Sequence, residues 1–350
     1  MNPRPDPPPP TISEKVNCLS RPAAYGRAGA VVERRETHMS WVFLVGDRAF
    51  KLKKPVRFDY LDFSTLPRRE AACRAEVALN GPLAPGVYRG VAPLKAGPGG
   101  LNICGEGEVV DWLVVMRRLD ERHTLERRLA DRPPSRAELD RLARALAGFY
   151  RSARPVGATA AAYQHAVRRA LDDDRSVLLR RELGLPSAQV HHIDAVMRRF
   201  LRTRGDQLGR RARRRRIVEV HGDLRPEHIW LGDEVKVIDR LEFNRALRIA
   251  DPVDELAFLD LECERLGSPG AGRRLREAVQ RRLHDDAPRE LVLFHRCHRA
   301  MLRARLSIAH LLEPRPRTPR KWPRQARAYL RLAARDAREL ELLLNRPAGR

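Results

Sequence analysis

Two acidic residues that each follow a short apolar run constrain this chain more than any other feature. The first is Asp223, which stands in the triplet His221-Gly222-Asp223 directly after the run IVEV. The second is Asp239, which closes the run VKVI sixteen residues further on. Short apolar runs bounded by turn residues predict strands. We expect these strands to be neighbouring hairpin arms, so that the two carboxylates converge on one point.

Such a pair of carboxylates has a specific chemical use. One carboxylate can orient a hydroxyl group or accept its proton, while the other holds Mg²⁺ on phosphate oxygens. Asp223 and Asp239 are therefore the first candidates for a site that handles phosphate groups.

A β-rich segment at 30–56 supplies a second group of candidates. Its runs VVERRE, SWVFLV and RAFKLKK read as strands, and a Gly46-Asp47 turn joins the last two. Side chains alternate between the two faces of a strand, so Ala49, Lys51 and Lys53 share one face. Lys51 therefore lies beside a small side chain and a second lysine.

The remaining pattern divides the chain into two lobes. A helix is predicted from the cap at Ser64-Thr65 to about Gly81, and strands at 90–93 and 109–116 complete a compact α+β lobe. Helical spacing then dominates, apart from the strands around Asp223 and Asp239. The predicted domains are a disordered proline-rich tail at 1–12, an N-terminal lobe at 13–119 and a helical C-terminal lobe at 120–345.

The motifs resemble those of a known family in the expected order. The run HGDLRPEH is similar to the catalytic loop of protein kinases and, more closely, to the HGD loop of aminoglycoside and choline-type phosphotransferases. Asp239 resembles the metal-binding aspartate of that superfamily, and Ala49-Phe50-Lys51 resembles the kinase Val-Ala-x-Lys strand. The runs ETHMSWVFLVG and EFNRALRIADPVDELAFL resemble a bacterial group in which this domain is often fused to a P-loop kinase domain. No GxxxxGK[ST] occurs in this sequence, so we expect that partner domain to be absent.

The resemblance implies an α+β, protein-kinase-like two-lobe fold that uses ATP and Mg²⁺ to phosphorylate a hydroxyl of a small molecule. Asp223 would accept or orient the hydroxyl proton, and Asp239 would bind the metal. Lys51 would hold the α- and β-phosphates, with Glu76 as its partner and Glu70 as the alternative. The resemblance further implies catalytic roles for His221 and Arg225. Ala49 would contact the adenine, as would Met116 in a hinge at 114–117. Asp254 would be a structural acid that braces the catalytic loop.

One position departs from the family pattern. The asparagine that follows the catalytic aspartate by five residues is replaced here by His228. Imidazole suits softer metals, whereas Mg²⁺ favours oxygen ligands. His228 remains the candidate second ligand, and three alternatives stay open: Asp239 alone suffices, Glu242 assists, or the site has decayed into that of a nucleotide-binding pseudokinase with a regulatory role.

The formal charge of +24 adds a third class of function. Arginines are spread over most helical stretches, but Arg210–Arg216 form a dense run that could contact nucleic acid. The same charge gives no sign of the acidic pocket that aminoglycosides call for, so the phosphate acceptor stays open.

Cysteine content and hydropathy indicate the cellular compartment. The five cysteines are scattered and odd in number, which favours a reducing compartment. The N-terminus lacks a signal-like apolar run, and no stretch reaches the ~18 apolar residues that span a bilayer. We therefore expect a cytoplasmic protein without a membrane span.

Overall fold

A computed structural model describes residues 9–27, 29–313, 316 and 318–346. The chain divides into two compact units, of which the first combines 1–121 with 236–245 and the second combines 122–235 with 246–350. The sequence predicted a boundary near 119 but not the return of 236–245 to the first unit. Among the described residues, no helix has both the length and the hydropathy needed to cross a membrane.

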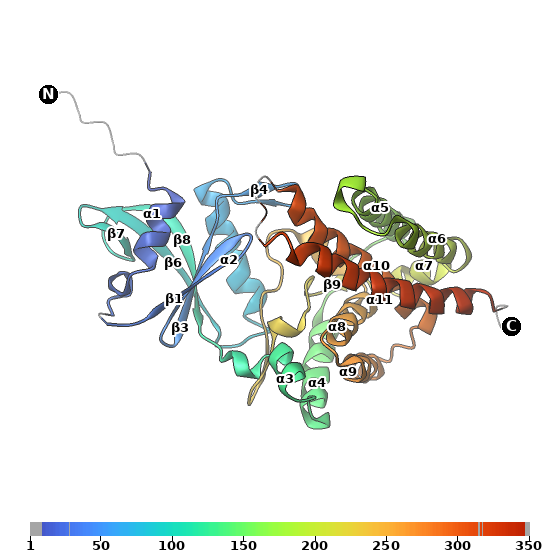
Figure 1. Cartoon of the computed structure of the whole chain (residues 1–350). Helices are drawn as coiled ribbons and strands as arrows, with labels where there is room; N and C mark the ends of the chain where they lie inside the picture. Colours follow the sequence, from blue (N-terminus) through green and yellow to red (C-terminus); the bar gives the residue numbers. More distant parts are fainter. Residues whose placement is uncertain (1–8, 28, 314–315, 317, 347–350) are drawn as a thin grey trace. The chain divides into compact units, whose positions relative to one another are not determined.

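The first unit is built on an antiparallel sheet of six strands (Figure 1) in the order β1-β2-β3-β8-β6-β7. The predicted Gly46-Asp47 turn joins β2 to β3. The strand predicted at 90–93 is longer than expected and pairs with an additional strand, β7, that the sequence analysis missed. The strands are β1 Val32–Glu36, β2 Ser40–Val45, β3 Arg48–Lys53, β6 Tyr88–Gly97, β7 Gly100–Ile103 and β8 Glu108–Arg117.

Two helices and a small hairpin accompany this sheet. Helix α2, Leu66–Asn80, begins where the Ser64-Thr65 cap predicted it, with a proline in its first turn. Helix α1, Ile12–Leu19, was not predicted. The short strands β4, Arg57–Phe58, and β5, Leu61–Asp62, pair with each other.

Helix α1 begins at Ile12, the last residue of the predicted tail. Residues 1–8 of that tail lie outside the described residues, but Thr11 caps α1 in a reciprocal capping box with Glu14. Val16 and Leu19 on the helix are buried in one apolar cluster with Leu52 and other residues of the sheet. The Thr-x-x-Glu spacing was a readable start signal, so the helical region begins immediately after the prolines.

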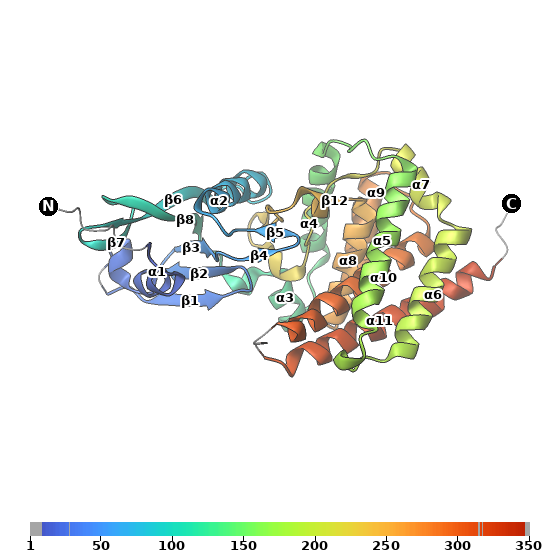
Figure 2. The same cartoon turned by 90° about the horizontal axis from the view of Figure 1, so that it is seen from above.

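The second unit is mainly helical, as the amphipathic spacing predicted (Figure 2). Helices α3, α4, α5 and α8 begin at side-chain caps, and at the start of α4 Ser135 and Glu138 form a capping box. The helices are α3 Leu125–Asp131, α4 Arg136–Ser152, α5 Ala160–Leu178, α6 Ser187–Thr203, α7 Asp206–Arg213, α8 Pro252–Arg265, α9 Pro269–Arg282, α10 Arg289–Ala309 and α11 Lys321–Leu344. Across both units, short 3₁₀ turns lie at Pro22–Tyr25, Glu121–His123, Arg181–Leu183, Pro226–His228, Arg245–Arg248 and His310–Leu312.

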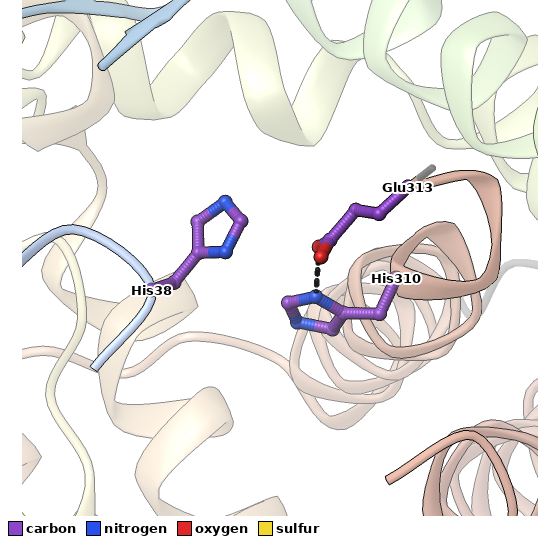
Figure 3. A group of neighbouring side chains, drawn as sticks. All are labelled: His38, His310 and Glu313. Atoms are coloured by element: carbon purple, nitrogen blue, oxygen red, sulfur yellow. Dashed lines mark hydrogen bonds and ion pairs between the residues drawn. The ribbon is translucent and has the colours of Figure 1, made fainter. Parts of the chain in front are cut away.

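The end of α10 contacts the start of α11 through ring stacking. His310, the C-cap of α10, places Nδ1 2.6 Å from a carboxylate oxygen of Glu313 (Figure 3). The His310 ring also stacks on Trp322 of α11, with ring centroids 4.0 Å apart. These contacts fix the N-terminal end of α11 against the C-terminal end of α10.

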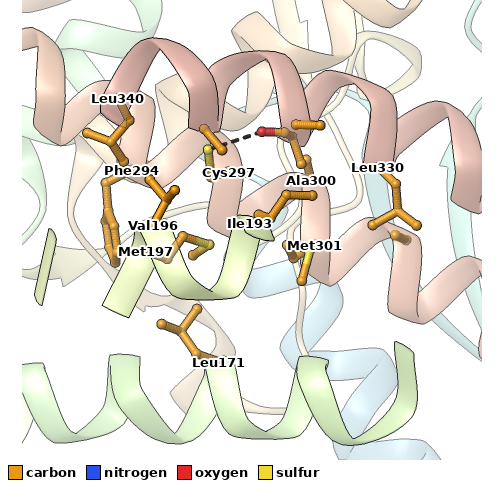
Figure 4. Close-up of a cluster of buried hydrophobic side chains, with 14 of the residues drawn as sticks. Leu171, Ile193, Val196, Met197, Phe294, Cys297, Ala300, Met301, Leu330 and Leu340 are labelled. Carbon is orange, nitrogen blue, oxygen red and sulfur yellow. Dashed lines mark hydrogen bonds between the residues drawn. The ribbon is translucent and has the colours of Figure 1, made fainter. Parts of the chain in front are cut away.

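The core of the second unit lies where α10 and α11 pack together with α5 and α6 (Figure 4). Phe200 of α6 stacks on Phe294 of α10 with ring centroids 4.4 Å apart. The thiol of Cys297 donates a hydrogen bond to the carbonyl oxygen of Ala333 at 3.5 Å. Cys297 is therefore a buried packing residue.

The strands around the two candidate aspartates pair differently from the prediction. The strand before Asp223, β9 Val218–Glu219, pairs antiparallel with β12 Ile249–Ala250. The strand before Asp239, β11 Val235–Val237, pairs with β10 Ile229–Leu231. The two strands thus belong to separate two-stranded sheets, because each finds its partner elsewhere in the chain, and the expectation of neighbouring hairpin arms was wrong.

Candidate functional site

A largely buried lysine in the first unit joins two of the predicted acids. Lys51 on β3 places Nζ 2.8 Å from a carboxylate oxygen of Glu76 on α2 and 2.8 Å from one of Asp239. Glu70 instead pairs with Arg74 one turn further along α2. The glutamate that meets Lys51 is therefore Glu76.

The second lysine of the same strand face has a different environment. Lys53 places Nζ 2.6 Å from the other oxygen of Glu76 and also contacts Glu242. Lys53 and Glu242 are both almost fully buried, and burial raises the pKa of the Glu242 carboxyl above its usual value. This pairing makes Glu242 a buried partner of a lysine, which disfavours the alternative in which it binds a metal.

The charges of this cluster do not balance. Three carboxylates, of Glu76, Asp239 and Glu242, surround the two ammonium groups of Lys51 and Lys53. Burial alone would lower the pKa of Lys51, but the charges of Asp239 and Glu76 hold it well above the usual range. With all five groups ionised, the cluster carries one excess negative charge. Asp239, whose side chain is 45% exposed, is its most accessible member.

The backbone at Asp239 is held in an uncommon conformation. Its φ is +62°, in the left-handed region that costs a non-glycine residue roughly 1 kcal/mol or more. The Asp239 N–H donates to the hydroxyl of Tyr88 at 3.1 Å, and the Arg240 N–H donates to the side-chain oxygen of Asn80 at 2.8 Å. Contacts from β6 and α2 thus fix the turn that presents the carboxylate, and strain of this kind concentrates at functional sites.

Ala49 and Met116 lie on strands beside this cluster. They are direct cross-strand partners between β3 and β8, and Tyr88 is the partner of Met116 on β6. Cross-strand partners share a sheet face, so these residues line the same face as Lys51. The amide of Arg117 donates to Val87 at 2.8 Å, so this part of the predicted hinge is already hydrogen-bonded within the sheet.

The second unit holds the other predicted group, the loop after β9. The carboxylate of Asp223 accepts a hydrogen bond from Arg225 Nε at 2.9 Å, and Arg225 also pairs with Glu227 at 2.7 Å. Burial would raise the pKa of Asp223, but the charge of Arg225, with smaller contributions from His228 and others, holds it below its usual value. Asp223 is therefore an ionised carboxylate, able to accept a proton or a hydrogen bond.

The residue that braces this loop is Glu255, one position beyond the predicted Asp254. Its carboxylate accepts the backbone N–H groups of His221 at 3.0 Å and Gly222 at 2.6 Å. Asp254 is instead bound by the guanidinium of Arg299 at 2.7 and 2.9 Å. The brace prediction was wrong because successive residues of a helix project about 100° apart, which motif similarity did not resolve.

His228, which replaces the expected asparagine, also holds the loop. Its Nδ1 lies 2.9 Å from the carbonyl oxygen of Asp223, and its Nε2 lies 3.3 Å from a guanidinium nitrogen of Arg225. The ring is buried. A metal ion at either nitrogen would displace one of these contacts, so the metal-ligand role of His228 stays a prediction that the geometry does not favour.

The first-unit cluster fits a divalent cation carried on phosphate groups better than His228 does. Asp239 offers hard carboxylate oxygens of the kind that Mg²⁺ prefers, and it is accessible. The ammonium of Lys51 can be shared between Glu76 and a phosphate oxygen, because its side chain is still 15% exposed.

Sequence comparison finds relatives that are longer than this chain. No protein-family profile matches the chain. It is 34% identical over 288 residues to the uncharacterized proteins Rv2004c of Mycobacterium tuberculosis and Mb2027c of Mycobacterium bovis. The matched region covers 81% of this chain and 56% of each relative. The chain thus spans a little over half the length of the curated relatives it matches.

Comparison with solved structures identifies the fold. A choline kinase from Cryptosporidium parvum superposes with a TM-score of 0.54 at 11% identity, covering 93% of this chain and 92% of that one. Choline kinase LicA from Streptococcus pneumoniae gives 0.54 at 14% identity, covering 92% and 99%. The GDP complex of aminoglycoside 2′-phosphotransferase-IIIa gives 0.52 at 17% identity, covering 94% and 99%. The chain has the protein-kinase-like fold of these enzymes. The predicted α+β two-lobe fold is therefore confirmed.

Sequence reasoning also missed several residues of the two clusters. Tyr88 and Asn80 hold the Asp239 turn, and Tyr150 donates its hydroxyl proton to Glu255 at 2.8 Å. None of these lies in a motif, and each acts across a long separation in sequence. Periodicity marked Asn80 only as a position near the end of a helix.

Proposed function

We propose that this protein is an ATP- and Mg²⁺-dependent phosphotransferase that acts on a hydroxyl group of a small molecule. The observation that carries the proposal is the placement of Lys51 between Glu76 and Asp239, on a fold shared with choline kinases and aminoglycoside phosphotransferases. A charged lysine beside an accessible carboxylate suits a triphosphate and its metal ion. One of the similar structures contains GDP and another AMP, which supports a nucleotide as the phosphate donor.

Each residue has a defined part in the proposal. Lys51 binds the α- and β-phosphates while Glu76 holds its ammonium group in place. Asp239 binds the magnesium ion, which when present neutralises charge on the phosphate oxygens. Asp223, kept ionised by Arg225, orients the acceptor hydroxyl and accepts its proton.

The acceptor is a small molecule with a free hydroxyl group. Sugars, amino alcohols, nucleosides and aminoglycosides are the classes to be tested, by measuring ATP consumption with the purified protein. The formal charge of +24 favours neutral or anionic acceptors over polycationic ones, because like charges repel.

Substitution of the two aspartates tests the proposal once an acceptor is found. Asp223→Ala and Asp239→Asn should each abolish phosphate transfer, while the melting temperature of the ligand-free protein changes little. Glu106→Gln is the matched control, because Glu106 is an exposed carboxylate in the loop before β8. Full transfer activity in either aspartate variant would show that the roles are wrongly assigned.

A second candidate function is that of a nucleotide-binding regulator without transfer activity. This regulatory function is favoured by His228, which replaces the asparagine of the family pattern. Both nitrogens of its ring already contact residues of the loop, Asp223 and Arg225. A rise in melting temperature with Mg·ATP, without hydrolysis or transfer to any acceptor in the screen, would select this function over the first.

A further inference from the structure

The exposed face of α11 is entirely basic over most of its length. From 321 to 338 every exposed residue of this helix is a lysine or an arginine. Neighbouring members are three or four residues apart, a spacing that places them in one row along a helix. This basic face of α11 comprises Lys321, Arg324, Arg327, Arg331, Arg335 and Arg338.

Half of these charges have no ion pair, hydrogen bond or aromatic-ring contact within the described residues, whereas the ammonium group of Lys321 lies over the ring of Trp322. Within the part of the chain that the structure describes, Arg324, Arg331 and Arg338 form no ion pair or hydrogen bond. By contrast, Arg335 pairs with Glu264, and Arg327 donates to a backbone carbonyl at 2.8 Å. The unpaired guanidinium groups alternate with paired ones along the row, so positive charge is available at both ends and in the middle.

The row lies on one face of a helix whose other face is fixed in the core. It spans 18 residues from Lys321 to Arg338, or about 26 Å at a rise of 1.5 Å per residue. The opposite face of α11 is buried in the core through Ala326, Tyr329 and Leu330 among others, as Figure 4 shows for Leu330 and Leu340. The helix therefore cannot rotate to pair these charges elsewhere.

The high arginine content of the chain does not by itself explain the row of positive charges on α11. Some arginines on other helices are neutralised by acids: Arg144 pairs with Asp140 on α4, and the half-buried Arg198 of α6 pairs with Asp172 of α5. No exposed acid interrupts the row on α11 between 321 and 338. A line of like charges repels itself, so it gains from a partner with a matching line of negative charge.

We propose that the basic face of α11 binds the phosphate backbone of a double-stranded nucleic acid. A duplex carries a regular line of negative charge that the row on α11 can follow over about five turns of protein helix. Contacts to phosphates carry no base information, so the binding is independent of sequence. This function is separate from the proposed phosphotransfer and does not require it.

Two other anionic partners fit the face less well. Proteins that bind single strands stack bases on exposed aromatic rings, but Trp322, at the start of the row, is already stacked on His310. Helices that bind membranes insert apolar side chains, and between 321 and 338 no exposed residue of α11 is apolar. Charge complementarity without stacking or insertion favours a duplex.

The run Arg210–Arg216 was the nucleic-acid candidate of the sequence analysis. Several of its arginines already have partners within the fold. Arg211 is buried between Asp251 and Asp285, and Arg210 pairs with Asp206. Arg216 donates to two backbone carbonyls. Three arginines of the run, Arg213, Arg214 and Arg215, are exposed, which makes them a matched control of equal charge.

The test compares two triple variants of the full chain. Arg324→Gln/Arg331→Gln/Arg338→Gln removes the unpaired charges of α11, and Arg213→Gln/Arg214→Gln/Arg215→Gln removes the same number elsewhere. All six positions are exposed, and glutamine is a good helix former at those within α11 and α7, so both variants should keep their thermal unfolding transition. Binding is measured by fluorescence anisotropy against a DNA duplex, an RNA duplex, a DNA single strand and anionic phosphatidylserine vesicles, each over a range of salt concentrations.

The expected result is at least tenfold weaker duplex binding by the α11 variant and little change in the control. The slope of log affinity against log salt should fall by about 2.7, because each of three lost phosphate contacts contributes about 0.9. An equal loss in both variants would show diffuse charge attraction instead. Absence of duplex binding by the unaltered protein, or tighter binding to single strands or vesicles, would equally overturn the proposal.

Discussion

The ammonium group of Lys51 lies 2.8 Å from a carboxylate oxygen of Asp239, although 188 residues separate them in the chain. Lys53, two residues further along the same strand, is buried between Glu76 and Glu242. One strand thus presents one lysine toward an accessible carboxylate and another to the interior. Loss of Lys51 should therefore affect activity, whereas loss of Lys53 should affect the stability of the fold.

Replacing each lysine by methionine should separate activity from stability. Lys51→Met should lower phosphate transfer at least about a hundredfold, as loss of one charge-stabilising donor does. Lys53→Met should instead destabilise the fold by about 3–5 kcal/mol, because it leaves Glu242 buried without its cation. Turnover assays and urea unfolding of both variants measure the difference. Equal stability of the two proteins would contradict the structural role of Lys53.

Glu255 should act as a positioning residue for the loop that holds Asp223. Glu255→Gln replaces one of two acceptor oxygens with a donor that faces a backbone N–H, at a cost of about 1–3 kcal/mol. We expect kcat to fall while KM for ATP stays nearly constant. Tyr150→Phe is the control, because it removes a third hydrogen bond to the same carboxylate without altering the loop. A larger kinetic effect from Tyr150→Phe would refute the assignment.

Arg211 should contribute to stability far more than its neighbours in the arginine run. Its guanidinium contacts the carboxylates of Asp251 and Asp285 at 2.5–2.7 Å in a buried site. Arg211→Met should cost about 3–5 kcal/mol in unfolding free energy, since both carboxylates lose their partner. Arg213→Gln, an exposed change in the same helix, should stay within about 0.5 kcal/mol. Chemical denaturation of the two variants gives both values.

Asp174 should make stability depend on pH. Burial raises its pKa to about 7, despite the Arg305 guanidinium 2.6 Å away, and its second oxygen has no hydrogen-bond partner among the described residues. Between the ordinary value of 3.8 and about 7, the folded protein binds a proton that the unfolded chain does not. Stability from this residue therefore falls as pH rises through that window and is constant above it.

The neutral variant Asp174→Asn tests this pH dependence. Relative to the unaltered protein, its unfolding free energy should increase steadily from about pH 4 to pH 7. Urea titrations at several pH values give the difference. A constant difference across this range would show that Asp174 is ionised in the folded state.

Elements that carry a local periodicity or a short motif could be predicted from the sequence. The strand with Lys51, the helix with Glu76 and the loop with Asp223 were all found, because each has a periodicity or a short motif. The pairing of β9 with β12 was not, since strands of two residues carry no readable pattern. The choice of Glu255 over Asp254 depends on the rotation of α8, which tertiary packing sets. Helix α1 was missed although its capping box was legible, because the preceding prolines suggested disorder.

The return of 236–245 to the first unit has a consequence for dissecting the protein. A fragment that stops at 121 would lack Asp239 and Glu242, leaving two lysines to share the single carboxylate of Glu76. Such a piece would enclose excess positive charge in its interior. The first unit is therefore encoded in two separated stretches of the gene, and it can be isolated only if the later stretch is joined to the earlier one.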